Sequence, residues 1–539
     1  PNFNFLVLFW FLLYFLYTIT NSTNQSNHKI VPLSMTASTN STNDKQNRAP
    51  LIWNSFCMGC LGLQCPGLWS HPDDKSRDFN TIEYWVNLAQ LLEKGKFNAL
   101  FIADVLGPYD VYDGPGNFRS VAKSGAQFPT TEPSAVVSAM AAVTKNIGFG
   151  ITFLTISENP YHFARRLATL DHLTKGRVGW NVVSSYLDSA AKNLLNGESL
   201  PPHAERYERA QEYIDVVYKL FLSSWSDDAV ELKNRVFTNP DKVREINHKG
   251  KFFTVPGPSI TEPTPQRLPV IIQAGTSKAG KEFAARNAEV VFITTFSPEE
   301  LGKQIKAIKT LAKEKYGRPE GSIKFLQLIT PVVADTHELA EEKFKELQLY
   351  GDLDGAQALF SGWTGIDIGK YDYEDNITDK GTNAVKSFLE LWNKTSPGEP
   401  ANVKKTRRDI ARQITVGGLG PVFYGTPEEV TDEIQRWVDI SGVDGFNVTY
   451  AISPGTFEDF VEKVVPLLQE RGLTQKDYPQ DLDHSLTFRE QLFGSDRKEP
   501  YYLLESHPAY DLRWRAGESK DEFERRLNKK RKSETQEIA

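Results

Sequence analysis

The chain has 539 residues, of which 40% are hydrophobic and 12% aromatic, and its formal net charge is −7 at pH 7. This length and composition allow one large barrel with insertions, or two domains. The mildly acidic balance gives no argument for a nucleic-acid partner. The three cysteines all lie between Cys57 and Cys65, which argues against a disulfide-stapled secreted scaffold.

The first 50 residues differ in composition from the rest of the chain. Residues 3–19 are almost wholly apolar and aromatic, close to the ~20 residues that a membrane span needs. Residues 20–48 are rich in Asn, Ser and Thr, a composition that predicts disorder. The sequence begins with Pro1, and Met35 lies just ahead of the globular pattern. Two explanations stay open: a membrane anchor at residues 3–19, or a natural start at Met35.

From residue 51 onward, apolar β-branched runs alternate with helical patterns. The predicted strands cover residues 51–57, 99–105, 147–154, 178–183, 270–274, 290–295, 325–333 and 446–451. The predicted helices cover residues 83–94, 134–144, 160–174, 207–221 and 279–287, and Ser297 and Thr426 are predicted N-caps of two more. Eight strands with intervening helices predict an α/β fold, a (β/α)₈ TIM barrel over residues 51–485.

Two intervals exceed a minimal barrel and predict long insertions after the fourth and seventh strands. Residues 185–269 hold one predicted helix and a long Pro- and Lys-rich loop, and residues 351–421 are rich in Gly, Asp and Asn. Loops this long inside a compact domain usually carry function, so both are expected to shape a substrate pocket. Residues 486–539 are predicted to form a charged C-terminal extension.

The stretch from Gly176 to Ser185 is the centre of the pattern. A buried strand here leads into the polar pair Ser184 and Ser185, as at the active-site rim of a TIM barrel. The alternative is that Trp180 and Asn181 only fill the barrel interior.

Several polar residues stand where chemistry is possible, although each has a structural alternative. Asp104 ends the second strand and Thr152 lies near the end of the third, which places both at the barrel mouth. His203 and Tyr207 are four residues apart and share a helix face. Ser277 follows a buried strand and opens a helix, which is typical either of an anion site or of an N-cap.

Other kinds of site find little support in the sequence. Cys57, Cys60, Cys65 and His71 have a spacing that matches no common zinc site, so buried thiols and no metal are expected. Asp104 has no second carboxylate placed as in a glycosidase pair. No Gly-x-Ser-x-Gly nucleophile elbow is present.

Taken in order, these segments resemble the bacterial-luciferase-like, flavin-dependent monooxygenases. Within that family they are most similar to the branch of nitrilotriacetate monooxygenase component A, dibenzothiophene-sulfone monooxygenase and pristinamycin synthase. The matching segments are residues 99–104, 133–144, 160–185, 203–213, 248–253, 269–280 and 507–508. The resemblance covers roughly residues 51–508 and omits the N-terminal apolar segment.

The resemblance implies a two-component enzyme that binds reduced FMN supplied by a separate NAD(P)H:flavin reductase. Oxygen would add to the flavin to form a C4a-hydroperoxide, which oxidises a small organic substrate. The family's flavin contacts fall on Asp104, Thr152, His203, Tyr207 and Ser277. A cytoplasmic homo-oligomer is expected, or a membrane-anchored one if residues 3–19 are an anchor.

Three other functions stay open at this point. One is a luciferase-like flavin or deazaflavin oxidoreductase without oxygen insertion. Another is a non-catalytic flavin-binding protein, and the third is a membrane-anchored barrel hydrolase. Residues 57–71 are richer in cysteine than in similar proteins, so no relative's substrate transfers to this chain.

Overall fold

The computed structural model describes residues 48–275, 277–375, 377, 405–479, 486–494 and 502–538. Residues 50–539 group into one compact unit. The apolar segment at residues 3–19 and Met35 lie outside the described residues. Within the described ranges, no helix is long and apolar enough to cross a membrane.

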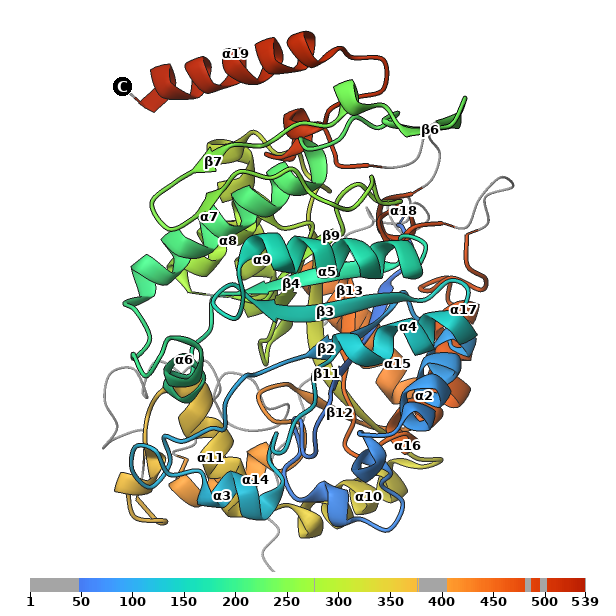
Figure 1. Ribbon diagram of the computed structural model, residues 1–539. Coiled ribbons are helices and arrows are strands. Elements are labelled where there is room, and N and C mark those ends of the chain that lie inside the picture. The colour runs from blue at the N-terminus through green and yellow to red at the C-terminus, as the bar shows by residue number, and fades with distance from the viewer. Residues whose placement is uncertain are drawn as a thin grey trace, which may run out of the picture. The chain divides into compact units, whose positions relative to one another are not determined.

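Eight parallel strands close into a barrel, which lies at the centre of Figure 1. Around the barrel the order is β1-β2-β3-β4-β9-β10-β11-β13, and β13 pairs with β1 to complete the ring. The strands are β1 (Ile52–Met58), β2 (Ala99–Ala103), β3 (Gly148–Leu154), β4 (Val178–Val183), β9 (Val270–Gln273), β10 (Val290–Ile293), β11 (Lys324–Val333) and β13 (Gly445–Val448). The predicted TIM barrel is confirmed, and each predicted strand lies within three residues of its observed ends.

Helices pack around the outside of the barrel through their apolar stripes. They are α2 (Ile82–Lys94), α4 (Ser134–Val143), α5 (Pro160–Leu173), α8 (Lys278–Asn287), α9 (Pro298–Tyr316), α10 (His337–Tyr350), α15 (Pro427–Ser441), and the run of α16 (Gly455–Asp459), η6 (Phe460–Val464) and α17 (Val465–Glu470). Both predicted caps are confirmed: Ser297 accepts from the Glu300 amide, and Thr426 forms a capping box with Glu429.

The end of the barrel where the strands begin is filled by α18 (Phe488–Phe493). Phe488 is fully buried among the inward-pointing strand side chains. A Cβ would lie 2.6 Å from the Phe488 ring if placed on Gly148 and 3.0 Å from it if placed on Gly179. The Phe488 ring therefore fits because both strand positions are glycines. Arg489 is fully buried and its Nε lies 2.6 Å from Oε1 of Glu289, which fastens α18 to the base of the barrel.

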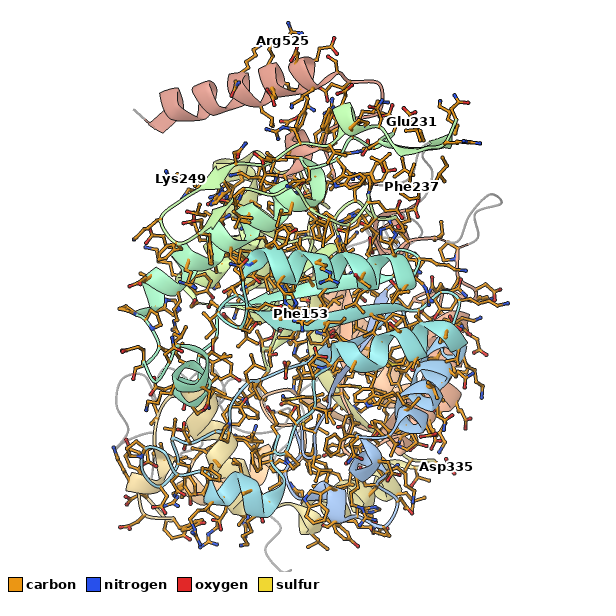
Figure 2. All side chains as sticks on the ribbon, in the orientation of Figure 1. Phe153, Glu231, Phe237, Lys249, Asp335 and Arg525 are labelled. Atoms are coloured by element: carbon orange, nitrogen blue, oxygen red, sulfur yellow. The ribbon has the colours of Figure 1, made fainter. Side chains whose placement is uncertain are left out.

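The insertion after β4 holds more regular structure than the one helix and long loop that its sequence predicts. It contains α6 (Asp188–Leu194), α7 (His203–Leu222), the hairpin of β5 (Val230–Lys233) and β6 (Val236–Thr238), η4 (Pro240–Lys242), and the pair β7 (His248–Lys249) and β8 (Thr254–Val255). Strands of two to four residues are too short to give a detectable alternation. Figure 2 shows Glu231 and Phe237 on the first hairpin, which projects from the body.

The insertion after β11, the seventh strand, adds structure at the carboxyl ends of the strands. It contains α11 (Leu353–Thr364), η5 (Ile368–Lys370) and α14 (Arg407–Ile414), and β12 (Val422–Gly425) pairs with the last part of β11. After β1 and β2 come η2 (Leu68–Ser70), η3 (Ser76–Asp78) and α3 (Arg119–Ser124). Figure 1 shows α3, α11 and α14 gathered at one end of the barrel. Both predicted insertions are therefore confirmed.

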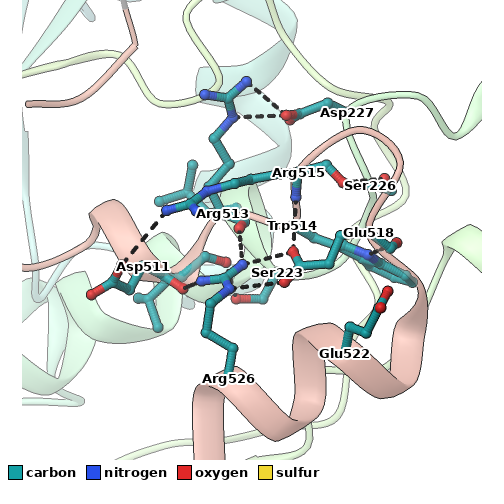
Figure 3. Close-up of polar contacts among 12 residues, drawn as sticks. Ser223, Ser226, Asp227, Asp511, Arg513, Trp514, Arg515, Glu518, Glu522 and Arg526 are labelled. Carbon is teal, nitrogen blue, oxygen red and sulfur yellow. Dashed lines mark hydrogen bonds and ion pairs between the residues drawn. The ribbon is translucent and has the colours of Figure 1, made fainter. Parts of the chain in front are cut away.

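The C-terminal segment is fastened to the insertion after β4 by the polar contacts in Figure 3. It contains η7 (Tyr510–Leu512) and α19 (Lys520–Ile538). Arg513 forms an ion pair with Asp227 at 2.7 Å, and the Trp514 amide donates to the Leu222 carbonyl at 2.9 Å. On α19, Arg526 lies 2.8 Å from Glu518. The division of the chain into domains at residues 50 and 485 stays a prediction.

Candidate active site

The barrel opens at the carboxyl ends of its strands into a cavity of about 550 Å³. Its wall is mostly apolar and aromatic. Four of its described lining residues have acidic or basic side chains, namely Asp104, Glu299, Glu300 and Lys303, and the last three lie at the start of α9. A largely apolar cavity with a few convergent polar groups is typical of a small-molecule site.

Three phenylalanines form an aromatic floor to this cavity. Phe56, Phe101 and Phe292 point inward from β1, β2 and β10, since alternate residues of a strand share a face. The Phe101 ring lies 4.7 Å from that of Phe292 and 5.5 Å from that of Phe56. The aromatic floor keeps water away from the deepest part of the cavity and offers apolar surface to a flat ring.

Polar groups from β3, β4 and β13 reach into the same cavity. Thr152 and Asn181 are neighbours in register, and the Asn181 amide donates to the Thr152 hydroxyl at 2.8 Å. Both Oδ1 of Asn181 and Oδ1 of Asn447 are buried without a hydrogen-bond partner in the described structure. A buried acceptor left unsatisfied costs about 1–3 kcal/mol, so the cavity is built to receive a ligand that carries N–H or O–H donors.

Asp104 lies immediately after β2 and lines the cavity. The pKa of its carboxyl is raised to about 8, mainly by burial and also by the nearby Glu132, while the Val105 amide and Arg166 act in the opposite direction. At neutral pH the group is therefore mostly protonated, and it presents a hydrogen-bond donor rather than a charge.

A second cluster lies where α8 begins. Ser277 caps the helix by accepting from the Gly280 amide at 3.1 Å, and its Oγ lies 3.4 Å from Nε2 of His203. The His203 and Tyr207 rings lie next to each other on α7, tilted by 51° and with centroids 5.0 Å apart. The first N–H groups of a helix have no partner within it and carry a partial positive charge. Hydroxyls, an imidazole and these N–H groups together suit a phosphate.

Gly275 shapes the loop that leads into this cluster. A Cβ at this position would lie 2.4 Å from Nε2 of Gln273 and 2.8 Å from the Tyr207 hydroxyl. Only glycine therefore lets the loop pass close to both side chains. Ala274, one residue earlier, lines the cavity, so the loop joins the cavity to the helix start.

The five predicted site residues thus fall into two clusters on one rim. Asp104 and Thr152 line the cavity, whereas His203, Tyr207 and Ser277 meet at the start of α8 and are joined to the cavity through Ala274. Their role in holding a flavin stays a prediction.

The alternative explanation, that Trp180 and Asn181 only fill the barrel interior, is not what the structure shows. Asn181 points into the barrel and lines the cavity. Trp180 points outward, where its ring lies 4.5 Å from Phe163 of α5 and 6.1 Å from Tyr213 of α7. Adjacent strand residues face opposite sides, so they cannot both fill the interior.

Several cavity residues were not predicted from the sequence. Asn447 and Tyr186 line the cavity, as do Tyr109 and Trp363. The one available signal was position: Tyr186 directly follows Ser185 in the central stretch, and Tyr109 lies five residues after Asp104.

The three cysteines are free thiols and all are buried. Burial raises the pKa of Cys57 and of Cys65 to about 12, so neither is a ready thiolate. Within the described ranges, no group of three or more His, Cys, Asp or Glu residues is arranged to hold a metal ion.

Comparison with known proteins places this cavity in context. A family model described as luciferase-like monooxygenase matches residues 61–444. The dimethyl-sulfide monooxygenase of Hyphomicrobium sulfonivorans is 45% identical over 465 residues, which are 86% of this chain and 94% of that protein. The long-chain alkane monooxygenase of Geobacillus thermodenitrificans is 44% identical over 458 residues, which are 85% of this chain and 96% of that protein. A crystal structure of riboflavin lyase with modified FMN and riboflavin has a TM-score of 0.76 at 33% identity and covers 86% of this chain and all of that one.

Proposed function

Because the chain belongs to the luciferase-like monooxygenase family, we propose that it is the oxygenase of a two-component system that uses reduced FMN. The enzyme is a flavin-dependent monooxygenase, as the resemblance in its motifs implied. What we propose beyond this is that the cofactor is FMN and that a separate NAD(P)H:flavin reductase supplies it in reduced form. The observation that carries them is the meeting of Ser277, His203 and Tyr207 at a helix start beside an apolar cavity.

The residues present fit FMN at both ends. Ser277, His203 and Tyr207 would hold the phosphate at the start of α8, where Gly275 lets the backbone pass close to the Tyr207 hydroxyl. The ring system would rest against the aromatic floor beside Asp104 and Thr152, where the unpartnered amide oxygen of Asn181 would accept an N–H. When bound, reduced flavin supplies the electrons that activate oxygen.

The chain's own contribution is binding, orientation and exclusion of water. The aromatic floor removes water from the deep end of the cavity, which protects a reactive cofactor from side reactions. The protonated Asp104 donates a hydrogen bond without adding a negative charge beside an electron-rich ring. A site whose side chains only bind, orient and exclude water needs no catalytic nucleophile paired with a general base.

A small uncharged organic molecule is the proposed substrate class. No arginine or histidine is found among the described lining residues, and Lys303 stands beside Glu299 and Glu300. The cavity therefore lacks the cation cluster that a polycarboxylate would require. Two of the relatives are named for uncharged substrates, dimethyl sulfide and long-chain alkanes, and these are the first compounds to test.

The proposal is tested by anaerobic titration of the purified protein with photoreduced FMN, followed by ¹⁸O₂ in the presence of dimethyl sulfide or hexadecane. We expect saturable binding of reduced FMN, and labelled product only when protein and reduced FMN are both present. Absence of saturable binding would refute the proposal. Tight binding with oxygen uptake but no label in any product would favour an oxidoreductase or a flavin carrier.

His203→Ala is expected to weaken FMN binding about fivefold to tenfold without unfolding the protein. His203 is exposed at the start of α7, so its loss removes a phosphate contact but no core packing. The measurement is the quenching of flavin fluorescence, with the melting temperature recorded in parallel. The control is His337→Ala, which removes an exposed histidine at the start of α10. A large drop in melting temperature with unchanged affinity would instead assign His203 a structural role.

Asp104→Asn is expected to stabilise the protein more as the pH rises. The folded-state pKa of Asp104 is about 8, whereas an unfolded aspartate has a pKa of about 4. Between these values the folded state alone keeps the proton, so wild-type stability falls as pH rises through this window and is level above it. Asparagine removes this effect. The melting-temperature advantage of the variant should therefore grow between pH 5 and pH 8, and a constant difference would contradict the raised pKa.

A further inference from the structure

Four cavity-lining residues from four separate segments form a connected hydrogen-bond network, here called the tyrosine network: Tyr109, Gln127, Tyr186 and Trp363. The Tyr109 hydroxyl is its centre. Its oxygen lies 3.0 Å from Oε1 of Gln127, 3.0 Å from Nε1 of Trp363 and 2.5 Å from the Tyr186 hydroxyl. The α11 helix approaches closely because Gly362 has no side chain: a Cβ there would overlap the Tyr109 ring.

The direction of each hydrogen bond in the tyrosine network follows from its partners. Nε2 of Gln127 donates to the Leu63 carbonyl, which can only accept, so Oε1 is the atom that faces Tyr109. An amide oxygen has no proton, and the Tyr109 hydroxyl must therefore donate to it. The Trp363 indole N–H can only donate, and Tyr109 accepts it.

One contact then remains to be assigned. Tyr109 has a single proton, which it gives to Gln127, so Tyr186 must donate its own proton to Tyr109. Tyr109 is thereby saturated, with one bond donated and two accepted. Tyr186 has spent its proton and keeps its acceptor lone pairs, and it lines the cavity near the mouth with 44% of its surface exposed.

The backbone holds Tyr186 in this place at some cost. The preceding residue, Ser185, is buried and has φ of +68°, a conformation that non-glycine residues seldom adopt. Its carbonyl accepts a hydrogen bond from Arg206 at 2.8 Å. A strained residue fixed by a specific partner indicates that the direction of the following side chain is imposed by the surrounding structure.

We propose that Tyr186 is a specificity-determining residue that accepts a hydrogen bond from any substrate with an O–H or N–H donor, and that the enzyme therefore binds such molecules more tightly than uncharged molecules without a donor, such as dimethyl sulfide. This rests on the proposed function for its assignment of the cavity to substrate. A molecule whose only polar atom is an acceptor cannot form a hydrogen bond with Tyr186, because neither partner has a proton to donate. Such a molecule binds more weakly because its polar atom is buried unpaired.

The test uses two size-matched probes, cyclohexanol and cyclohexanone, titrated by saturation-transfer NMR into protein loaded with oxidised FMN. The wild type is expected to bind cyclohexanol about fivefold to tenfold more tightly than cyclohexanone. Tyr186→Phe should remove this preference. Equal wild-type affinities, or a preference that persists in Tyr186→Phe, would overturn the proposal.

A second variant keeps the test decisive if Tyr186→Phe fails to fold. Tyr109→Phe removes the acceptor of the Tyr186 proton, which becomes free to meet a ligand, so the preference should shift toward cyclohexanone. An unchanged ratio would overturn the proposal. The matched control is Tyr424→Phe, a part-exposed tyrosine outside this cavity, which should keep the wild-type ratio. Flavin fluorescence in the same samples reports FMN binding separately, so loss of FMN binding with an intact preference refutes the proposed function alone.

Discussion

Ser277→Asp is expected to abolish binding of reduced FMN while the protein stays folded. Ser277 is an exposed N-cap, and aspartate caps a helix as well as serine does and favours the positive helix start. Stability should therefore be unchanged or slightly higher. The new carboxylate would stand where the phosphate is proposed to bind. Two like charges about 4 Å apart repel by about 4 kcal/mol at an effective dielectric constant of 20, close to a thousandfold in affinity.

The measurement is a fluorescence titration with FMN, together with the melting temperature of the variant. Thr336→Asp provides the control, because Thr336 caps α10 in the same way and stands at a different helix start. It should leave FMN affinity unchanged. If Ser277→Asp binds FMN as the wild type does, the phosphate does not lie at the start of α8.

Arg489→Met should lower the free energy of unfolding by about 3–5 kcal/mol, because it leaves the buried Glu289 without its counter-charge. Burial by itself would raise the pKa of Glu289, but Arg489, together with His507 and the Ile271 amide, holds that pKa below its ordinary value. Arg489 also donates to the Leu268 carbonyl at 2.7 Å, a bond that methionine cannot make. The measurement is the urea dependence of unfolding.

A double variant separates charge from packing at the same site. Arg489→Met combined with Glu289→Gln removes both charges, so much of the lost stability should return. Little recovery would mean that the hydrogen bonds of Arg489 matter more than its charge. Full wild-type stability in Arg489→Met alone would show that α18 does not support the base of the barrel.

The barrel was predictable because its strands are buried on both faces. Such strands appear in the sequence as continuous apolar runs, such as Val178–Val183, whose predicted ends match the structure. The second half of the insertion after β4 was not predictable in the same way. The pair of β7 and β8 has two residues a strand, and its position is set by contacts with α7, such as the Glu212 carboxylate that accepts from the Phe252 amide at 2.9 Å.

The site, too, was predictable where a residue's position follows from its strand, and not where it depends on contacts between distant segments. Asp104 and Thr152 could be placed at the mouth because the end of a barrel strand has a fixed position. His203 and Ser277 are 74 residues apart, and only the family resemblance joined them before the structure did. The part played by Tyr186 depends on a proton count across four segments, which no local pattern contains.

The ring of strands also constrains how the protein is made. The Thr449 hydroxyl, just after β13, donates to the Phe56 carbonyl of β1, 393 residues earlier, and the base is filled by α18 from still later in the chain. A ribosome that has produced the first half has therefore made strands whose final neighbours do not yet exist. The apolar edges of these strands stay unpaired until almost the whole polypeptide has emerged. During that interval, aggregation competes most strongly with folding of the barrel.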